Sequence, residues 1–131
     1  MSSVRCDCQH VIRDTTDNLP FKARFLPDQN DIPFMETITK DLAELVDLAS
    51  KGRREEWIAK HFLKGYPLDI PDVSVISDYL SGQISAHFGL AYQCDECGRL
   101  LIYRDTKSHA RVFVPNGEWK GTFEKITSGK G

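Results

Sequence analysis

Four cysteines are the residues in this sequence best suited to bind a metal ion. They form two close pairs, Cys6-Asp-Cys8 and Cys94-Asp-Glu-Cys97, within a chain of 131 residues. Two thiolates separated by one or two residues can reach the same ion, and four thiolates complete the closed tetrahedral coordination of a structural zinc site. The sequence therefore predicts one structural Zn²⁺ held by Cys6, Cys8, Cys94 and Cys97.

A redox-active pair is the main alternative to a metal site. In thioredoxin-like proteins a Cys-x-x-Cys pair lies at a helix N-terminus, where the helix dipole lowers the pKa of the thiol. Here Gly98 and an apolar run over residues 100–103 follow the second pair, which indicates a strand. A redox role also leaves Cys6 and Cys8 unexplained. Structural metal is the favoured interpretation, and cysteines without a ligand are the third alternative.

The second pair resembles the knuckle of zinc-ribbon proteins, in which a strand enters a Cys-x-x-Cys turn closed by glycine and a second strand leaves it. The stretch Cys94-Asp-Glu-Cys97-Gly98 carries this resemblance. The first pair departs from it, because its spacing is Cys-x-Cys and Gln9 stands where a knuckle often has glycine. His10 could replace one cysteine as a ligand at this end. The whole chain also resembles small bacterial proteins built from a ribbon and helices, which implies no activity.

The distance in sequence between the two pairs is long for a ribbon. Between Cys8 and Cys94 lie 85 residues. Closing a loop of that length costs about 4 kcal/mol, whereas zinc binding to small peptides contributes ~10–16 kcal/mol. We therefore expect one zinc-stabilised domain over residues 1–131, in which the ion joins the terminal strands and its loss loosens the whole fold.

Helical patterns fill most of the segment between the cysteine pairs. After an alternating, strand-like stretch at residues 21–25, helices are predicted at residues 31–52, at residues 53–64 and from Asp72 onward. Apolar residues on one face of the first helix are Ile38, Leu42, Leu45, Val46 and Ala49. Its other face is acidic and suits a basic partner; that face carries Glu36, Lys40, Asp41, Glu44 and Asp47.

Strands are predicted on both sides of the second cysteine pair. Residues 84–93 alternate between apolar and polar types, and their end indicates a strand, although a longer third helix competes for Ile84 and Phe88. Further strands are predicted at residues 100–103, 111–114 and 118–123. The predicted fold class is α+β: a small antiparallel zinc-ribbon sheet formed by both chain ends, with about three helices inserted at about residues 31–83 and a flexible tail at about residues 125–131.

Composition and charge restrict the class of protein. Hydrophobic residues make up 40% and charged residues 27% of the chain, as in ordinary globular domains. The N-terminal segment lacks the apolar core of a signal peptide and no apolar run is long enough to span a membrane, so a cytoplasmic protein is expected.

Charge is distributed unevenly along the chain. Residues 1–98 hold 10 Lys/Arg and 16 Asp/Glu, whereas residues 99–131 hold 7 Lys/Arg and 3 Asp/Glu. The basic end is therefore a candidate binding surface.

Three functions from different classes fit these features. The favoured one is a non-enzymatic protein-binding module with one structural zinc, such as a bacterial immunity or antitoxin-type protein, because neither a phosphate-binding loop nor a nucleophile motif is present. A nucleic-acid-binding zinc ribbon is the first alternative; its candidate residues are Arg99, Arg104, Lys107, Arg111, Lys120, Tyr103, Phe113 and Trp119. The second is a small hydrolase or nuclease in which His87 and His109, with Lys107 nearby, act as an acid/base pair.

Overall fold

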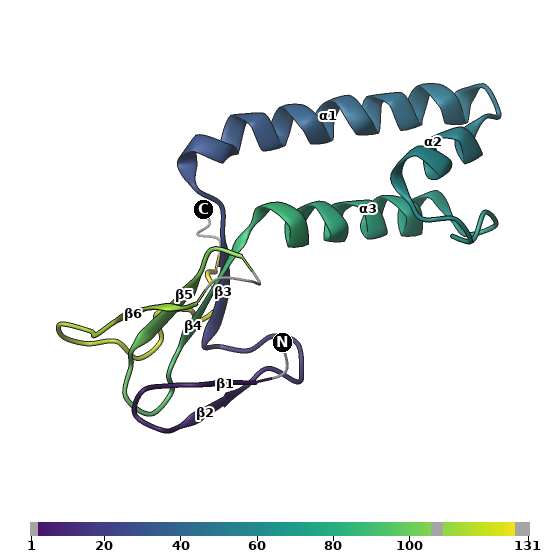
Figure 1. Cartoon of the computed structure of the whole chain (residues 1–131). Coiled ribbons are helices and arrows are strands. Elements are labelled where there is room, and N and C mark those ends of the chain that lie inside the picture. Colours follow the sequence, from purple (N-terminus) through teal and green to yellow (C-terminus); the bar gives the residue numbers. More distant parts are fainter. Residues whose placement is uncertain (1–2, 106–108, 128–131) are drawn as a thin grey trace. The chain divides into compact units, whose positions relative to one another are not determined.

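The described part of the chain, residues 3–105 and 109–127 of a computed structural model, contains three helices and six short strands (Figure 1). It is an α+β fold, as the sequence predicts. Residues 1–25 and 88–131 form one compact unit, here called the sheet unit, and residues 26–87 form a second, here called the helix unit. No helix in the described part is both long and apolar enough to cross a membrane.

The sheet unit is built from antiparallel strands of both chain ends. Strands β1 (Ser3–Arg5) and β2 (Val11–Arg13) form a hairpin. The second sheet has the order β3-β4-β5-β6. Its strands are β3 (Lys22–Phe25), β4 (Gly89–Gln93), β5 (Leu100–Tyr103) and β6 (Arg111–Phe113). Because β3 precedes the helices and β4 follows them, the helix unit is an insertion in this sheet, as predicted.

A small core holds the sheet unit together. Its buried residues come from both sheets and include two of the cysteines: Val4, Cys6, Ile12, Tyr92, Cys94 and Leu101. Six buried side chains are few for an independently stable domain, since small domains often need a metal or disulfides to supplement the core. Because Cys6 and Cys94 lie inside this core, an ion bound to their sulfur atoms would directly stabilise the packing of the sheet unit.

Asp14 ties the loop after β2 to the sheet. Its carboxylate lies 2.7 Å from the Lys22 ammonium and accepts a hydrogen bond from the hydroxyl of Tyr92. Burial acts to raise the pKa of Asp14, but hydrogen bonds from Lys22 and Tyr92 hold that pKa below its usual value. Asp14 therefore stabilises the folded state above the pKa of the unfolded carboxyl, and this contribution is lost as the pH falls through the lowered folded-state pKa.

Replacing Asp14 by asparagine is expected to destabilise the sheet unit by about 1–2 kcal/mol, because a charged hydrogen-bond acceptor is lost beside Lys22. The difference from wild type should stay constant between about pH 5 and pH 8, where the carboxylate is fully ionised in both states. Urea unfolding across that range measures it, with the exposed Asp17→Asn as the matched control. A difference that changes within the range would contradict the assignment.

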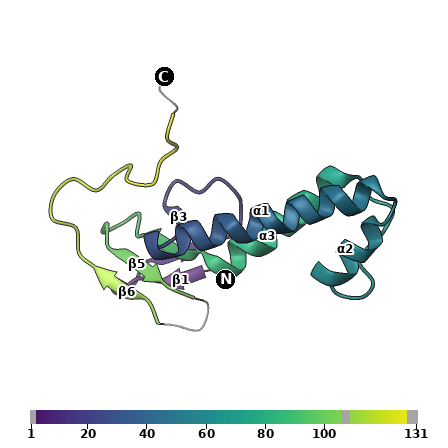
Figure 2. The same cartoon turned by 90° about the horizontal axis from the view of Figure 1, so that it is seen from above.

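The helix unit consists of α1 (Asp28–Ser50), α2 (Arg54–His61) and α3 (Asp72–His87). Within this unit α1 and α3 run side by side in opposite directions (Figures 1 and 2). Its buried core is separate from that of the sheet unit and comprises Ile38, Leu45, Trp57, Ile58, Val75 and Tyr79. The Trp57 indole is fully buried at its centre, so each unit has its own hydrophobic core.

Asp41 connects the three helices rather than facing solvent. Its backbone carbonyl accepts a hydrogen bond of 2.8 Å from Trp57 Nε1, and its carboxylate accepts one from the Tyr79 hydroxyl. Glu44 similarly lies 3.1 Å from Lys60 of α2. The predicted acidic face of α1 is therefore narrower than expected, because two of its carboxylates serve contacts within the helix unit and Glu36 and Asp47 remain exposed.

Several predicted boundaries and faces are wrong. Helix α1 begins at Asp28, not at Asp31, because Pro27 immediately precedes its first turn. Both aspartates lie in that turn, at the positive end of the helix dipole. Val46, predicted to be buried, is 70% exposed. The insertion extends beyond residues 31–83, since α3 includes Ile84 and ends at His87 before β4 begins.

The segment at residues 118–123 is a turn and not the predicted strand. Glu118 accepts hydrogen bonds from the amides of Trp119 and Lys120, and Gly121 has a φ of 80°, which a strand does not allow. Of the predicted tail at residues 125–131, residues 128–131 lie outside the described part. The three helices and the strands on both sides of the second cysteine pair lie close to where the sequence places them, whereas β1 and β2 have no counterpart among the predicted strands.

Candidate metal centre

Both cysteine pairs lie on turns between antiparallel strands, and the two turns have similar backbone hydrogen bonds. In the β1–β2 turn the Cys6 amide donates to the His10 carbonyl and the Gln9 amide donates to the Cys6 carbonyl, both at 2.9 Å. In the β4–β5 turn the Cys94 amide donates to the Arg99 carbonyl and the Gly98 amide to the Cys94 carbonyl, also at 2.9 Å.

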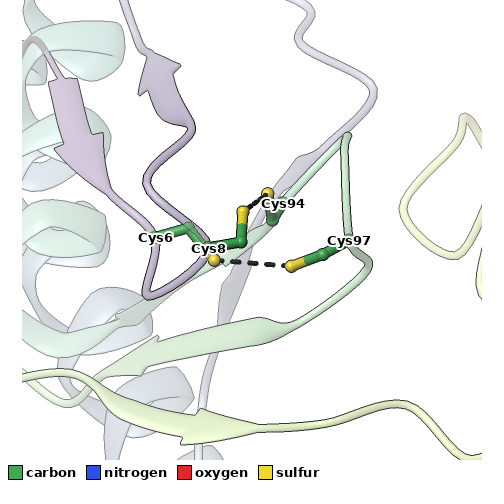
Figure 3. A group of neighbouring side chains, drawn as sticks. All are labelled: Cys6, Cys8, Cys94 and Cys97. Carbon is green, nitrogen blue, oxygen red and sulfur yellow. Dashed lines mark hydrogen bonds between the residues drawn. The ribbon is translucent and has the colours of Figure 1, made fainter.

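The first turn thus has the same backbone hydrogen-bond pattern as the second despite its shorter spacing. Gln9 has a φ of 81° and Gly98 has a φ of 82°, so glutamine occupies the left-handed position that glycine fills in the second turn. The departure from the zinc-ribbon pattern at Gln9 is therefore one of residue type and not of backbone conformation. Each turn directs its two cysteines toward the other turn (Figure 3).

The four sulfur atoms form one cluster. Cys6 Sγ lies 3.5 Å from Cys97 Sγ, and Cys8 Sγ lies 3.6 Å from Cys94 Sγ (Figure 3). All four sulfurs lie within 4.8 Å of one another. Four thiolates at a Zn–S distance of ~2.3 Å around a tetrahedral ion are about 3.8 Å apart. The cluster could therefore hold a metal ion with little movement of the side chains.

The four thiols are free in this structure. The short contacts join Cys6 with Cys97 and Cys8 with Cys94, that is, cysteines of different turns, at distances well beyond the ~2.05 Å of a disulfide bond. The second turn leads into β5 and not into a helix, so the feature that lowers thiol pKa values in thioredoxin-like pairs is missing from it. This geometry favours a shared ligand over a redox pair within either turn.

Burial raises the pKa values of the cysteine thiols, whereas hydrogen bonds from backbone amides to the sulfur atoms lower them. Burial raises the pKa of the Cys94 thiol to about 12, although the amides of Cys97 and Glu96 donate hydrogen bonds to its sulfur. Burial also acts to raise the pKa of Cys97, but hydrogen bonds from the Arg99 amide, the Cys6 thiol and the Arg99 guanidinium bring it down to about 6. Arg99 Nη1 lies 3.3 Å from Cys97 Sγ. These donors would offset part of the negative charge of four thiolates around a divalent ion.

His10 is not part of the sulfur cluster. Its Nε2 lies 2.9 Å from Asp95 Oδ1, and this polar contact joins the two cysteine turns. Among the described residues the four cysteines are the only group of three or more metal-binding side chains whose ligand atoms converge. Since four thiols complete a tetrahedral shell, the arrangement fits a structural ion and leaves no coordination position for substrate.

The sequence suggested that both candidate acid/base histidines lie on the sheet, but His87 lies in a helix. His87 lies in the last turn of α3, where its Nδ1 is 2.9 Å from the Gln83 carbonyl and its ring packs against Phe34. His109 belongs to the sheet unit, and Lys107 lies outside the described residues. The fourth histidine, His61, packs against Trp57 in the helix unit.

The candidate nucleic-acid residues have different environments. Arg99 contacts the sulfur of Cys97, and Trp119 packs over Gly98, so these two side chains support the second cysteine turn. Tyr103 is partly buried against the sheet-unit core, while Arg104 and Lys120 are exposed. Only Arg111 and Phe113 combine exposed charge and an exposed ring on one strand, with Phe113 54% exposed. Nucleic-acid binding stays a prediction.

Two supporting contacts could not be found from sequence. The His10–Asp95 pair and the packing of Trp119 on Gly98 join residues that are far apart in the chain. Neither contact has a local pattern, because the sequence does not give how the two cysteine turns face each other or where the segment after β6 packs. The only indication in the sequence is that histidine and aspartate are side chains that can pair with each other.

Comparison with known proteins shows the family of the chain. Residues 2–117 match the model of a family described as Domain of unknown function (DUF8617), and the chain belongs to that family. No curated protein and no solved structure matches the chain.

Proposed function

We propose that this chain is a non-enzymatic protein-binding module whose sheet unit is held together by one structural zinc ion. The convergence of four cysteine sulfurs in a closed set is the observation that supports the zinc ion. Zinc fits better than the harder cations because thiolate ligands select soft or borderline metals. The ion would link Cys6 and Cys8 to Cys94 and Cys97, so that its role is to fix the fold and not to activate a substrate.

An exposed apolar stripe on α1 supports the protein-binding role. Ile32, Met35 and Val46 are 69%, 54% and 70% exposed, and their spacing places them on one side of the helix. Large apolar side chains that remain exposed together on one face mark interaction sites in many proteins. Glu36 and Asp47 border the stripe.

The charge of the helix unit indicates the kind of partner. Residues 26–87 carry 6 Lys/Arg and 11 Asp/Glu, whereas the sheet unit carries 11 Lys/Arg and 8 Asp/Glu. An acidic surface with an apolar stripe complements a basic protein that presents its own apolar residues, because opposite potentials favour the encounter and the apolar contact slows dissociation.

Affinity capture with the zinc-loaded protein at low salt tests this proposal. Wild type should retain one specific basic protein, and the double variant Ile32→Gln, Val46→Gln should bind the purified partner at least tenfold more weakly, because it removes two apolar anchors. Leu63→Gln is the matched control, since Leu63 is 91% exposed in the same unit but outside the stripe. Equal binding by the double variant, or no retained partner, would contradict the proposal.

A further inference from the structure

The exposed stripe on α1 continues between its large side chains. Thr39 and Ala43 lie between Met35 and Val46 and are also exposed. The extended stripe consists of five residues at i, i+3, i+7, i+11 and i+14, namely Ile32, Met35, Thr39, Ala43 and Val46. Because α1 is one continuous helix over this span (Figures 1 and 2), these residues share one face over about 21 Å. None of the five is charged, so the extended stripe is a long, narrow apolar surface.

The side chains of the extended stripe are small in its middle. Thr39 and Ala43 are shorter than Ile32 and Val46, which lie at its two ends. Short side chains at a contact let a second backbone approach closely, as in helix pairs packed at the smaller interaxial distances. Spacings of three and four residues are also those of the seam between two packed helices. The shape of the extended stripe therefore fits a helix laid along α1.

The backbone of α1 decides between a helix and an extended segment as the partner element. Inside a regular helix the backbone N–H and C=O groups bond to one another, so the surface from Met35 to Val46 offers them to no partner. An extended segment laid along this surface would bury its own N–H and C=O groups without hydrogen bonds, which costs free energy. A helix satisfies its own backbone and presents apolar side chains at the matching spacing.

The charges beside the extended stripe are concentrated at one end. Residues 28–39 carry no Lys or Arg and three carboxylates, those of Asp28, Asp31 and Glu36. None of these carboxylates takes part in an ion pair among the described residues. At the other end Lys40 is present, and Asp47 lies 3.1 Å from Lys51. Cations of a partner are therefore favoured over the first half of α1.

Two of these carboxylates lie on opposite sides of the apolar residues. The positions of Asp31 and Glu36 on the helix place Ile32 and Met35 between them. Asp31 also offsets the positive end of the helix dipole, but Glu36 lies beyond the first turn, where that effect has faded. An apolar strip with acidic edges is complementary to a helix with an apolar strip and basic edges.

We propose that the extended stripe binds an amphipathic α-helix of the protein partner, whose Lys or Arg residues lie over the first half of α1. The inference rests on the proposed protein-binding function and names the partner element that the same site takes. Apolar side chains of that helix pack against Ile32, Met35 and Val46. Its backbone approaches α1 most closely at Ala43, and its cations face Glu36 and its neighbouring carboxylates.

NMR titration of the zinc-loaded protein with a synthetic peptide tests the site without any natural partner. The probe is an amphipathic peptide with leucines at the spacing of the extended stripe and lysines along both edges of its apolar face. Saturable shifts are expected at the amides of Thr39 and Ala43, and transferred NOEs should show a helical bound peptide. The Trp57 indole should not move, because it is buried and bonded to the Asp41 carbonyl. A peptide with glutamine in place of every lysine should bind at least about fivefold more weakly.

Ala43→Gln tests the close approach of the two helices. Glutamine keeps a high helix propensity, but its longer side chain would hold the peptide away from α1. Binding of the lysine peptide should weaken by at least about fivefold. Ala59→Gln is the matched control, since Ala59 is an exposed alanine of α2, and it should bind like wild type.

The double variant Asp31→Asn, Glu36→Gln tests the acidic edges. It should bind the lysine peptide at least about fivefold more weakly and the glutamine peptide like wild type, because only the charge is removed. Glu55→Gln, Asp69→Asn makes an equal charge change at exposed residues of the helix unit outside α1 and should bind both peptides like wild type.

Absence of saturable shifts at Thr39 and Ala43, an extended bound peptide, or wild-type binding by Ala43→Gln or by Asp31→Asn, Glu36→Gln would overturn the helix assignment. Capture of a basic partner through the stripe is measured separately with the Ile32→Gln, Val46→Gln variant. A failure of the peptide with intact capture refutes only the helical form of the partner element, and a failure of capture refutes the protein-binding function.

Discussion

Removing the metal is expected to unfold the sheet unit while the helices of the helix unit stay folded. The sheet unit has only six buried core residues, and two of these are the proposed ligands Cys6 and Cys94. Zinc binding to small peptides contributes ~10–16 kcal/mol to folding, which exceeds what so small a core can supply. The helix unit contains no cysteine and has its own core around Trp57.

The two tryptophans report on the two units separately. Trp119 belongs to the sheet unit and Trp57 to the helix unit. After chelation, and likewise in a Cys94→Ser, Cys97→Ser variant, the Trp119 indole should become solvent-exposed while Trp57 stays buried. The helical circular dichroism signal should persist, because all three helices lie in residues 26–87.

This expectation is narrower than the one from sequence, which predicts that metal loss loosens the whole chain. The reason for the change is the division of the apolar residues into two separate clusters, one in each unit. A single cooperative loss of both tryptophan environments and of the helical signal would show that the units fold as one. An unchanged Trp119 after chelation would contradict the stabilising role of the ion.

Replacing Gly98 by alanine should destabilise the sheet unit by about 3 kcal/mol. Part of this cost is conformational, because a residue with a Cβ is strained at a φ of 82° by about 1–2 kcal/mol. The rest is steric, because the added methyl group would overlap the Trp119 indole and force it to move. Urea unfolding of the zinc-loaded variant measures the sum, and zinc competition with a chelator should show weaker binding.

Two further variants separate these causes. In a Trp119→Ala background, Gly98→Ala should no longer cost the steric part of the unfolding free energy, because the indole is absent. The conformational part of the cost should remain. Gln9→Gly places glycine at the matching φ of 81° in the first turn, and its stability should stay within about 1 kcal/mol of wild type, since relief of strain opposes the greater freedom of the unfolded chain. If Gly98→Ala unfolds like wild type, the packing of Trp119 on this turn is wrong.

The sequence predicts the local structure around the second cysteine pair well. Cys94 and Cys97 are flanked by apolar runs and closed by Gly98, and these neighbours are enough to indicate two strands and a turn. The spacing of Cys6 and Cys8 likewise predicts that they share one ion with the second pair. What the sequence leaves open is the backbone of the first turn, because Gln9 does not by itself indicate a positive φ.

Failures occur where two local patterns fit the same residues or where the contact is long-range. Ile84 matches both the helical and the alternating pattern, and it lies in α3. Val46 continues the apolar face of α1, yet it is exposed because no other element covers it in the described part. Asp41 looks like a surface charge until Trp57 and Tyr79 are seen to bond to it. Each case depends on tertiary contacts that periodicity does not encode.

The central claim is that the four cysteines hold one zinc ion. Native mass spectrometry of protein purified without added metal tests it most directly, beside the Cys94→Ser, Cys97→Ser variant. The account predicts one zinc per wild-type chain, none in the variant, and four thiols that react with a thiol reagent only after the zinc is removed. A folded, metal-free wild-type chain with reactive thiols would contradict it.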